Sequence, residues 1–197
     1  MIPMITSASE IAAVKSIIAG ICKDLDKKDI KYDPDIRLGI MVETPAAAIM
    51  ADVLAKEVDF FSIGTNDLTQ YMLAVDRGNE NVSYLYSALN PAVLRSIKRI
   101  IECAHSAGIE VGMCGEAAAD ERMLPLLLAY GLDEFSVSVS RVLEVRKNIA
   151  SWNLKEAKDV AESISGYSDE KEVSNYLSDY IASRQRESDD IKDDGNN

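Results

Sequence analysis

Short, largely apolar runs alternate with longer amphipathic stretches along most of this chain, and the alternation predicts its architecture. Runs with the length of buried β-strands lie at residues 37–42, 58–63, 109–113 and 134–139. Between them, apolar residues recur at helical spacing, as in 91–107, which is followed by Gly108. Strands that alternate with helices pair in parallel through right-handed crossovers, so the pattern predicts an α/β fold.

The remaining segments complete this plan. Residues 2–5 are typical of the end of a further strand, and Ser7 or Ser9 is expected to cap the helix that follows. Further segments are assigned as helix at 45–56 and 120–130, as a polar loop at 64–78, and as a helical turn within that loop at 68–73. Two or three helices are expected to finish the chain. The resulting strands, about five, are too few to close an eight-stranded barrel.

Composition divides the chain into one domain and a tail. With 47% hydrophobic and 27% charged residues, the chain has the composition of a soluble globular protein. Residues 184–197, by contrast, are mostly acidic or polar. We therefore expect a single domain at residues 1–183 and an acidic disordered tail at residues 184–197.

The charge and the cysteine pattern exclude several classes of protein. A formal net charge of −12 argues against nucleic acid or a membrane surface as partner, because both would attract a basic patch. No apolar run approaches the roughly 20 residues of a membrane span, and the N-terminus does not resemble a signal peptide. Three cysteines without a C-x-x-C pair favour neither disulfides nor structural zinc. These features favour a cytoplasmic protein.

Residues suited to anion or metal chemistry stand where the predicted strands and loops meet. They are Glu43, Asn66, Asp67, Arg77 and Cys114. The carboxyl ends of parallel strands gather at one edge of a sheet, so groups far apart in sequence are expected to converge there. Two carboxylates, an amide, a guanidinium and a thiol at one edge would form a cation-assisted phosphate site.

The two carboxylates have both a functional and a structural interpretation. Glu43 and Asp67 offer the hard oxygen ligands that suit Mg²⁺ or Mn²⁺, with water and substrate oxygens completing an octahedron. Either residue alone is also compatible with an ordinary helix cap or loop acid. The glycines beside them favour the functional interpretation, because they let a ligand approach the backbone closely.

The other three residues are open to the same alternative. Asn66 offers an amide donor. Arg77 is suited to holding a phosphate or carboxylate with two parallel hydrogen bonds, or else to a surface salt bridge with Asp76 or Glu80. Cys114 either faces the pocket from the mouth of a strand or packs as a small apolar residue.

Longer segments around these residues carry a specific resemblance. The segments are 39–47, 58–71, 73–79 and 112–116. In this order they resemble the C-terminal domain of Enzyme I, the phosphoenolpyruvate-protein phosphotransferase of the bacterial sugar transport system, and the similarity runs from Met1 to about Ile181. Pyruvate phosphate dikinase and phosphoenolpyruvate synthase share the strand-end pattern, but 43–45 and 75–79 are more similar to Enzyme I.

This resemblance implies a role for each candidate residue. Glu43 and Asp67 would bind Mg²⁺, Asn66 and Arg77 would hold phosphoenolpyruvate, and Cys114 would be the general acid that protonates the enolate of pyruvate. The resemblance also implies an acceptor histidine on a separate N-terminal domain. That histidine would pass the phosphoryl group to a small histidine-containing phosphocarrier protein.

The resemblance also implies an incomplete barrel. The catalytic domain of the family is a (β/α)₈ barrel, and this chain resembles its C-terminal half, with extra helices at the end. Two phosphate-binding arginines of the family lie on strands outside this half. Family proteins dimerise through this domain, and exposed sheet edges favour pairing with another copy or with a separate first half. Alternative functions are a non-catalytic dimerisation or interaction module, a related dikinase or synthase, and a lyase or aldolase of the same barrel group.

Overall fold

A four-stranded parallel sheet forms the centre of residues 1–194, the part of the chain that the computed structural model describes. Its strands are β1 (Gly39–Val42), β2 (Phe60–Gly64), β3 (Glu110–Cys114) and β4 (Glu134–Phe135). They lie side by side in chain order, and every neighbouring pair is parallel. This is the arrangement of half an eight-stranded (β/α)₈ barrel, so the predicted α/β half-barrel is confirmed.

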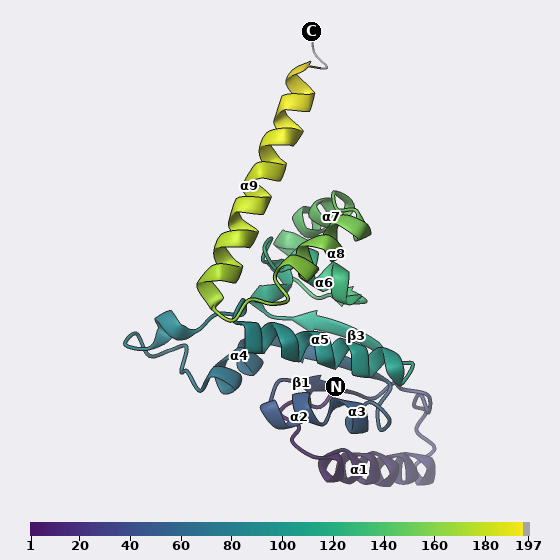
Figure 1. Ribbon diagram of the computed structural model, residues 1–197. Coiled ribbons are helices and arrows are strands. Elements are labelled where there is room, and N and C mark those ends of the chain that lie inside the picture. Colours follow the sequence, from purple (N-terminus) through teal and green to yellow (C-terminus); the bar gives the residue numbers. More distant parts are fainter. Residues whose placement is uncertain (195–197) are drawn as a thin grey trace.

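Helices connect the strands and continue after the last of them (Figure 1). They are α1 (Ala8–Lys27), α2 (Pro45–Ile49), α3 (Ala51–Leu54), α4 (Thr65–Leu73), α5 (Pro91–Ser106), α6 (Leu124–Tyr130), α7 (Val142–Ala150), α8 (Leu154–Ser163) and α9 (Glu170–Asp194). Short 3₁₀ turns lie at η1 (Ser83–Leu85), η2 (Glu116–Ala119) and η3 (Val139–Arg141). Capping hydrogen bonds stabilise the starts of α1 and α2. At α1 the Glu10 carboxylate accepts the Ser7 N–H at 2.9 Å, and at α2 Thr44 Oγ1 accepts the Ala47 N–H at 3.0 Å.

The two faces of the sheet have different environments. Phe61, Val111 and Met113 are at most 1% exposed and share one apolar core with residues of α5 and α6. Because side chains alternate along a strand, Ser62 and Cys114 lie on the opposite face, where they are partly exposed. In a closed barrel this second face lines the interior, and we call it the inner face.

Some predicted helices differ from the structure in extent. The segment predicted as a polar loop at 64–78 contains α4, a nine-residue helix. Its polar residues Thr65, Asn66 and Asp67 were interpreted as loop, but they form the first helical turn, where an acid complements the free N–H groups. The predicted helix at 45–56 is divided at Met50 into α2 and α3, and α6 begins only at Leu124.

The outer strands are shorter than predicted. The segment 134–139 pairs with β3 only at Glu134–Phe135. The Ser136 N–H still donates to the Met113 carbonyl at 2.9 Å, and the η3 turn begins at Val139. Residues 2–5 contribute a single bridge, from Ile2 to Ile40. Pro3 has no N–H with which to extend that pairing.

The last helix, α9, packs against the domain through its first half and projects away from it (Figure 1). Val173 and Leu177 are 1% exposed, and Tyr180 stacks on Trp152 with ring centroids 6.1 Å apart. Arg184 lies over the same indole at 4.2 Å. The helix continues to Asp194, into the segment 184–197 for which the sequence predicts a disordered tail, and no glycine or proline interrupts residues 170–194. Residues 195–197 lie outside the described part.

No helix within the described residues is both long and apolar enough to cross a membrane. The division of the chain into a domain at 1–183 and a tail stays a prediction.

Candidate active site

The five candidate residues all lie at one edge of the sheet. Glu43 follows β1 directly, Asn66 and Asp67 lie in the first turn of α4 after β2, and Cys114 is the last residue of β3. The strands are parallel, and their register pairs Val42 with Ile63 and Gly64 with Cys114. The carboxyl ends therefore lie together, as the sequence predicts. Arg77 reaches this edge from the loop after α4.

Glu43 is the most buried of the candidate residues. It is 3% exposed, and its Oε1 accepts the Met4 N–H at 2.8 Å. Its Oε2 lies only 2.6 Å from the point that a Cβ on Gly64 would occupy. Because Gly64 pairs with Cys114 in the register, the Glu43 carboxylate and the Cys114 thiol flank the same glycine on the inner face. Glycine at position 64 therefore makes room for the carboxylate.

Asp67 and Arg77 face each other. Arg77 Nη2 lies 3.8 Å from Asp67 Oδ1, and both side chains are partly exposed to solvent. The surface salt bridge considered from the sequence joined Arg77 to Asp76 or Glu80; within the described part of the chain, Arg77 pairs with Asp67 instead. A long, exposed ion pair of this kind contributes little stability, so both side chains keep bonding capacity for a ligand.

The side chain of Asn66 is oriented by the loop after β3. Its Oδ1 accepts the backbone N–H of Glu116 at 3.2 Å. Because the oxygen is used in this way, the amide NH₂ is left with two donors for a ligand. The Asn66 carbonyl accepts the Tyr86 hydroxyl at 3.1 Å. Burial raises the pKa of Tyr86 and nearby Arg77 opposes this shift, so at neutral pH the phenol keeps the proton that it donates.

A pocket of about 570 Å³ opens beside Asn66. Its lining comes from the loops after β2, β3 and β4 and is Asn66, Gly115, Glu116, Ala119, Asp120, Ser136, Val137, Ser138 and Arg141. Of the five candidate residues, Asn66 lines this pocket and the other four do not. Ligand pockets of about 300–1,000 Å³ hold small molecules.

Cys114 lies on the inner face, at the mouth of β3. The Ser62 hydroxyl donates to its sulfur at 3.7 Å, and the thiol can donate to the Ile63 carbonyl at 3.7 Å. Its backbone carbonyl accepts the Thr65 hydroxyl at 2.9 Å. The thiol is thus partly exposed and hydrogen-bonded, in contrast to a cysteine packed as an apolar residue. Cys103, on α5, fits the packing interpretation, since burial raises its thiol pKa.

The expected metal site has two protein carboxylates, those of Glu43 and Asp67. In the described residues, no group of three or more His, Cys, Asp or Glu is arranged to hold a metal ion. The chemistry of the donors nevertheless fits Mg²⁺, which is often bound through one or two carboxylates, with water and substrate phosphate supplying the other oxygens. The Glu43 Oε2 atom has no protein hydrogen bond among those residues and is turned toward Gly64.

Gly115, in the loop after β3, lies close to the start of α4, and this close approach gives a testable prediction. Its φ is +99°, and a Cβ there would contact Thr65 Oγ1. Gly115→Ala is expected to lower the free energy of unfolding by about 1–3 kcal/mol in chemical denaturation, because strain and contact add. Gly108→Ala is the matched control, since Gly108 has φ +75° but open space around its Cβ position. Equal losses in the two variants would contradict a role for the close approach to Thr65.

Several residues of this edge were not identified from the sequence. Tyr86 was interpreted as packing, and the contribution of Glu116 is made by its backbone, which no sequence pattern reveals. Thr65 and Ser62 lie within a segment that carried the resemblance, but their hydrogen bonds to Cys114 depend on the strand register.

Comparison with known proteins identifies a family for this chain. The family described as PEP-utilising enzyme, PEP-binding domain matches residues 1–154. The chain belongs to this family. Its relatives include proteins named phosphoenolpyruvate-protein phosphotransferase: that of Haemophilus influenzae is 52% identical over 162 residues, covering 82% of this chain and 28% of the relative. Those of Staphylococcus aureus and of Buchnera aphidicola subsp. Schizaphis graminum are 46% and 45% identical over 181 residues, covering 92% of this chain and 32% of each relative.

This PEP-binding-domain chain thus spans 28–32% of the length of the curated relatives it matches. Among solved structures, a citrate lyase from Burkholderia xenovorans LB400 is similar, with a TM-score of 0.52 and 15% identity. The match covers 93% of this chain and 62% of that protein. At this identity the similarity shows the fold alone, and it agrees with the parallel half-barrel.

Proposed function

We propose that this chain is the phosphoenolpyruvate- and Mg²⁺-binding part of a phosphoenolpyruvate-protein phosphotransferase. In the proposed reaction the phosphoryl group leaves phosphoenolpyruvate for a histidine on a separate domain, and pyruvate is released. The observation that carries the proposal is the common edge of Glu43, Asn66, Asp67, Arg77 and Cys114 in a chain of the PEP-binding-domain family.

Binding and orientation of the substrate fall to Asn66 and Arg77. The Asn66 NH₂ donates to an anionic oxygen, since its own oxygen is occupied by the Glu116 N–H. Arg77 offers a planar guanidinium that holds a phosphate or carboxylate with two hydrogen bonds. Phosphoryl transfer depends mainly on positioning and charge neutralisation, which these groups supply.

Glu43 and Asp67 would hold Mg²⁺ at this edge. When bound, the cation neutralises charge on the phosphate and orients it. The Met4 N–H fixes the Glu43 carboxylate in place, and the Arg77 guanidinium faces Asp67. Departure of the phosphoryl group leaves the enolate of pyruvate. The Cys114 S–H then gives its proton to the methylene carbon, forming the C–H bond of pyruvate and leaving a thiolate.

The partners follow from the same proposal. They are phosphoenolpyruvate, a domain with the phosphorylated histidine and a histidine-containing phosphocarrier protein, in a cytoplasmic sugar transport system. The incompletely covered inner face and the outermost strands favour a homodimer or pairing with the first half of a barrel, since within the described residues β1 is bridged on its outer side by Ile2 and β4 is the last strand of the sheet.

The proposal is tested by exchange of labelled pyruvate into phosphoenolpyruvate. The chain is mixed with the part of the Haemophilus influenzae relative that precedes the matching region, with Mg²⁺ present. Exchange above that of either piece alone is expected, and it should fall by about 100-fold with Arg77→Ala because the phosphate loses its guanidinium. Arg37→Ala is the control, since Arg37 lies at the amino end of β1 and pairs with Glu110 at the opposite edge.

A second candidate function is a non-catalytic dimerisation or interaction module. The partly exposed inner-face side chains favour it, because half a barrel leaves them incompletely covered. Dimerisation by sedimentation, together with no exchange in the mixture and no phosphoenolpyruvate binding, would support this function over phosphotransfer.

A further inference from the structure

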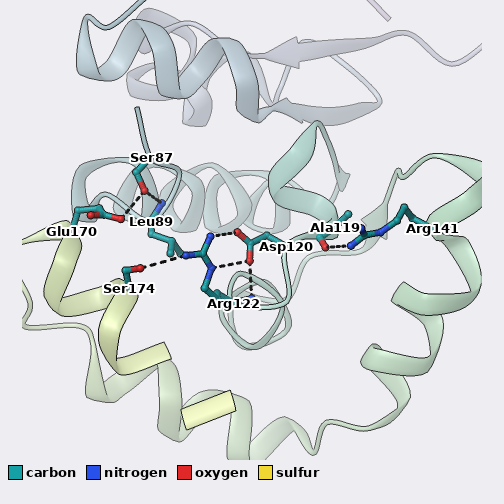
Figure 2. Close-up of polar contacts among 8 residues, drawn as sticks. All are labelled: Ser87, Leu89, Ala119, Asp120, Arg122, Arg141, Glu170 and Ser174. Atoms are coloured by element: carbon teal, nitrogen blue, oxygen red, sulfur yellow. Dashed lines mark hydrogen bonds and ion pairs between the residues drawn. The ribbon is translucent and has the colours of Figure 1, made fainter. Parts of the chain in front are cut away.

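Arg122 connects the loop after β3 to the C-terminal helix (Figure 2). Its Nε and Nη2 atoms donate to the two carboxylate oxygens of Asp120 at 3.1 and 2.7 Å, and its backbone N–H donates to the same carboxylate at 2.9 Å. Its Nη1 donates to Ser174 Oγ of α9 at 3.3 Å. Such a two-pronged contact fixes both the position and the orientation of the carboxylate.

Asp120 ends the loop that orients Asn66. The loop leaves β3 at Cys114, passes Gly115 and makes the η2 turn up to Ala119. Its Glu116 N–H donates to Asn66 Oδ1. At the far end, Arg141 donates to the Ala119 carbonyl at 3.0 Å (Figure 2). The loop is therefore held at Cys114 by the sheet and at its other end by two arginines.

The segment on the other side of Asn66 is also connected to α9. Tyr86 donates to the Asn66 carbonyl, and the adjacent Ser87 donates to the Glu170 carboxylate at 2.9 Å. Figure 2 shows Glu170 and Ser174 on the first turns of α9, facing Ser87 and Arg122 respectively. Both segments that contact Asn66 thus rest on the same end of one helix. That helix begins after residue 154, where the family match ends.

We propose that Arg122 is a positioning residue of the candidate site: through Asp120 and Ser174 it holds the loop that points the Asn66 amide toward the anion. In this proposal Arg122 acts through the loop and not through a contact with the substrate. The inference rests on the proposed function, because it assumes that Asn66 binds phosphoenolpyruvate. It gives the Asp120–Arg122 ion pair and helix α9 a role in phosphoenolpyruvate binding, although neither belongs to the residues that are expected to contact the substrate.

The test uses Arg122→Lys, which keeps the charge but loses the two-pronged contact. Asp120→Asn is the second, milder variant. Arg99→Lys is the matched control, since Arg99 also pairs with an aspartate, Asp52, at 3.2 Å but between α3 and α5. Phosphoenolpyruvate and Mg²⁺ are titrated separately into each protein, and the Asn66 side-chain amide signal is followed by ¹⁵N-correlated NMR, assigned by its loss in Asn66→Asp.

In Arg122→Lys, we expect a displaced or broadened Asn66 amide signal, about tenfold weaker binding of phosphoenolpyruvate and unchanged Mg²⁺ affinity. In an Asn66→Ala background, Arg122→Lys should have no further effect on that binding, because the two residues act through one contact. Arg99→Lys should change none of these quantities.

An unchanged Asn66 signal in both Arg122→Lys and Asp120→Asn would overturn the proposal, as would a tenfold loss that persists in the Asn66→Ala background. Failure of the unaltered chain to bind phosphoenolpyruvate would count against the proposed function instead. In that case the NMR signal, which needs no substrate, still decides whether Arg122 positions Asn66.

Discussion

Glu43→Gln is expected to remove the Mg²⁺-dependent part of phosphoenolpyruvate binding, weakening it on the order of 100-fold, or about 2.7 kcal/mol. The substitution keeps the size of the side chain and an oxygen for the Met4 N–H, so the local fold is retained. It removes the negative charge from a residue that is 3% exposed, where water screens charge least. Asp67→Asn should have the same direction of effect, since it removes the other carboxylate.

The measurement is calorimetric titration of phosphoenolpyruvate at several Mg²⁺ concentrations. The affinity of the unaltered chain should rise with Mg²⁺, and that of Glu43→Gln should not. Glu110→Gln is the control, because Glu110 lies at the amino end of β3 and pairs with Arg37 at 2.8 Å, at the opposite edge of the sheet. Unchanged affinity and Mg²⁺ dependence in both Glu43→Gln and Asp67→Asn would reject the metal assignment.

The sequence was sufficient to predict which edge of the sheet holds the candidate residues. Parallel strands bring their carboxyl ends together whatever the length of the connections, so the position of Glu43 after β1 and of Cys114 at the end of β3 followed from the strand pattern. The apolar strands and α5 were recognised for the same reason, because burial on one or both faces imposes a period on the sequence.

The errors arose where tertiary contacts override local pattern. The first turn of α4 contains polar residues that are typical of loops, yet the Thr65 hydroxyl bonds to the Cys114 carbonyl and the Asn66 oxygen bonds to the Glu116 N–H. These contacts hold the start of α4 against the end of β3, and they can be recognised only when the pairing of the strands is known.

The orientation of the Asn66 side chain could not be predicted from the sequence, because it depends on a hydrogen bond from the backbone. The amide type was visible, but the direction of its donors depends on the Glu116 N–H, and the place of that N–H depends on the bend at Gly115. Asp120 and Arg122 are two residues apart in the sequence, so the sequence does not distinguish their ion pair from an ordinary local salt bridge. The contact of Arg122 with Ser174, on which its proposed role at the site depends, joins residues 52 positions apart.

Cys114→Ala is expected to lower the rate of hydrogen exchange at the methyl group of pyruvate by about 10²- to 10⁴-fold. In the reverse direction of the proposed reaction, a thiolate removes a methyl proton to give the enolate. Alanine has no group that accepts it, and the neighbouring Ser62 hydroxyl is too weak a base to replace the thiolate. Exchange is followed by ¹H NMR in D₂O with pyruvate, Mg²⁺ and inorganic phosphate.

The same variant should keep its affinity for phosphoenolpyruvate within about twofold, since Cys114 is assigned to proton transfer and not to binding. Cys103→Ala provides the control, because Cys103 is a partly buried thiol on α5, away from the carboxyl edge. A methyl exchange rate in Cys114→Ala equal to that of the unaltered chain would remove Cys114 as proton donor. A loss of binding with normal exchange per bound pyruvate would instead move Cys114 from the chemical step to the walls of the substrate site.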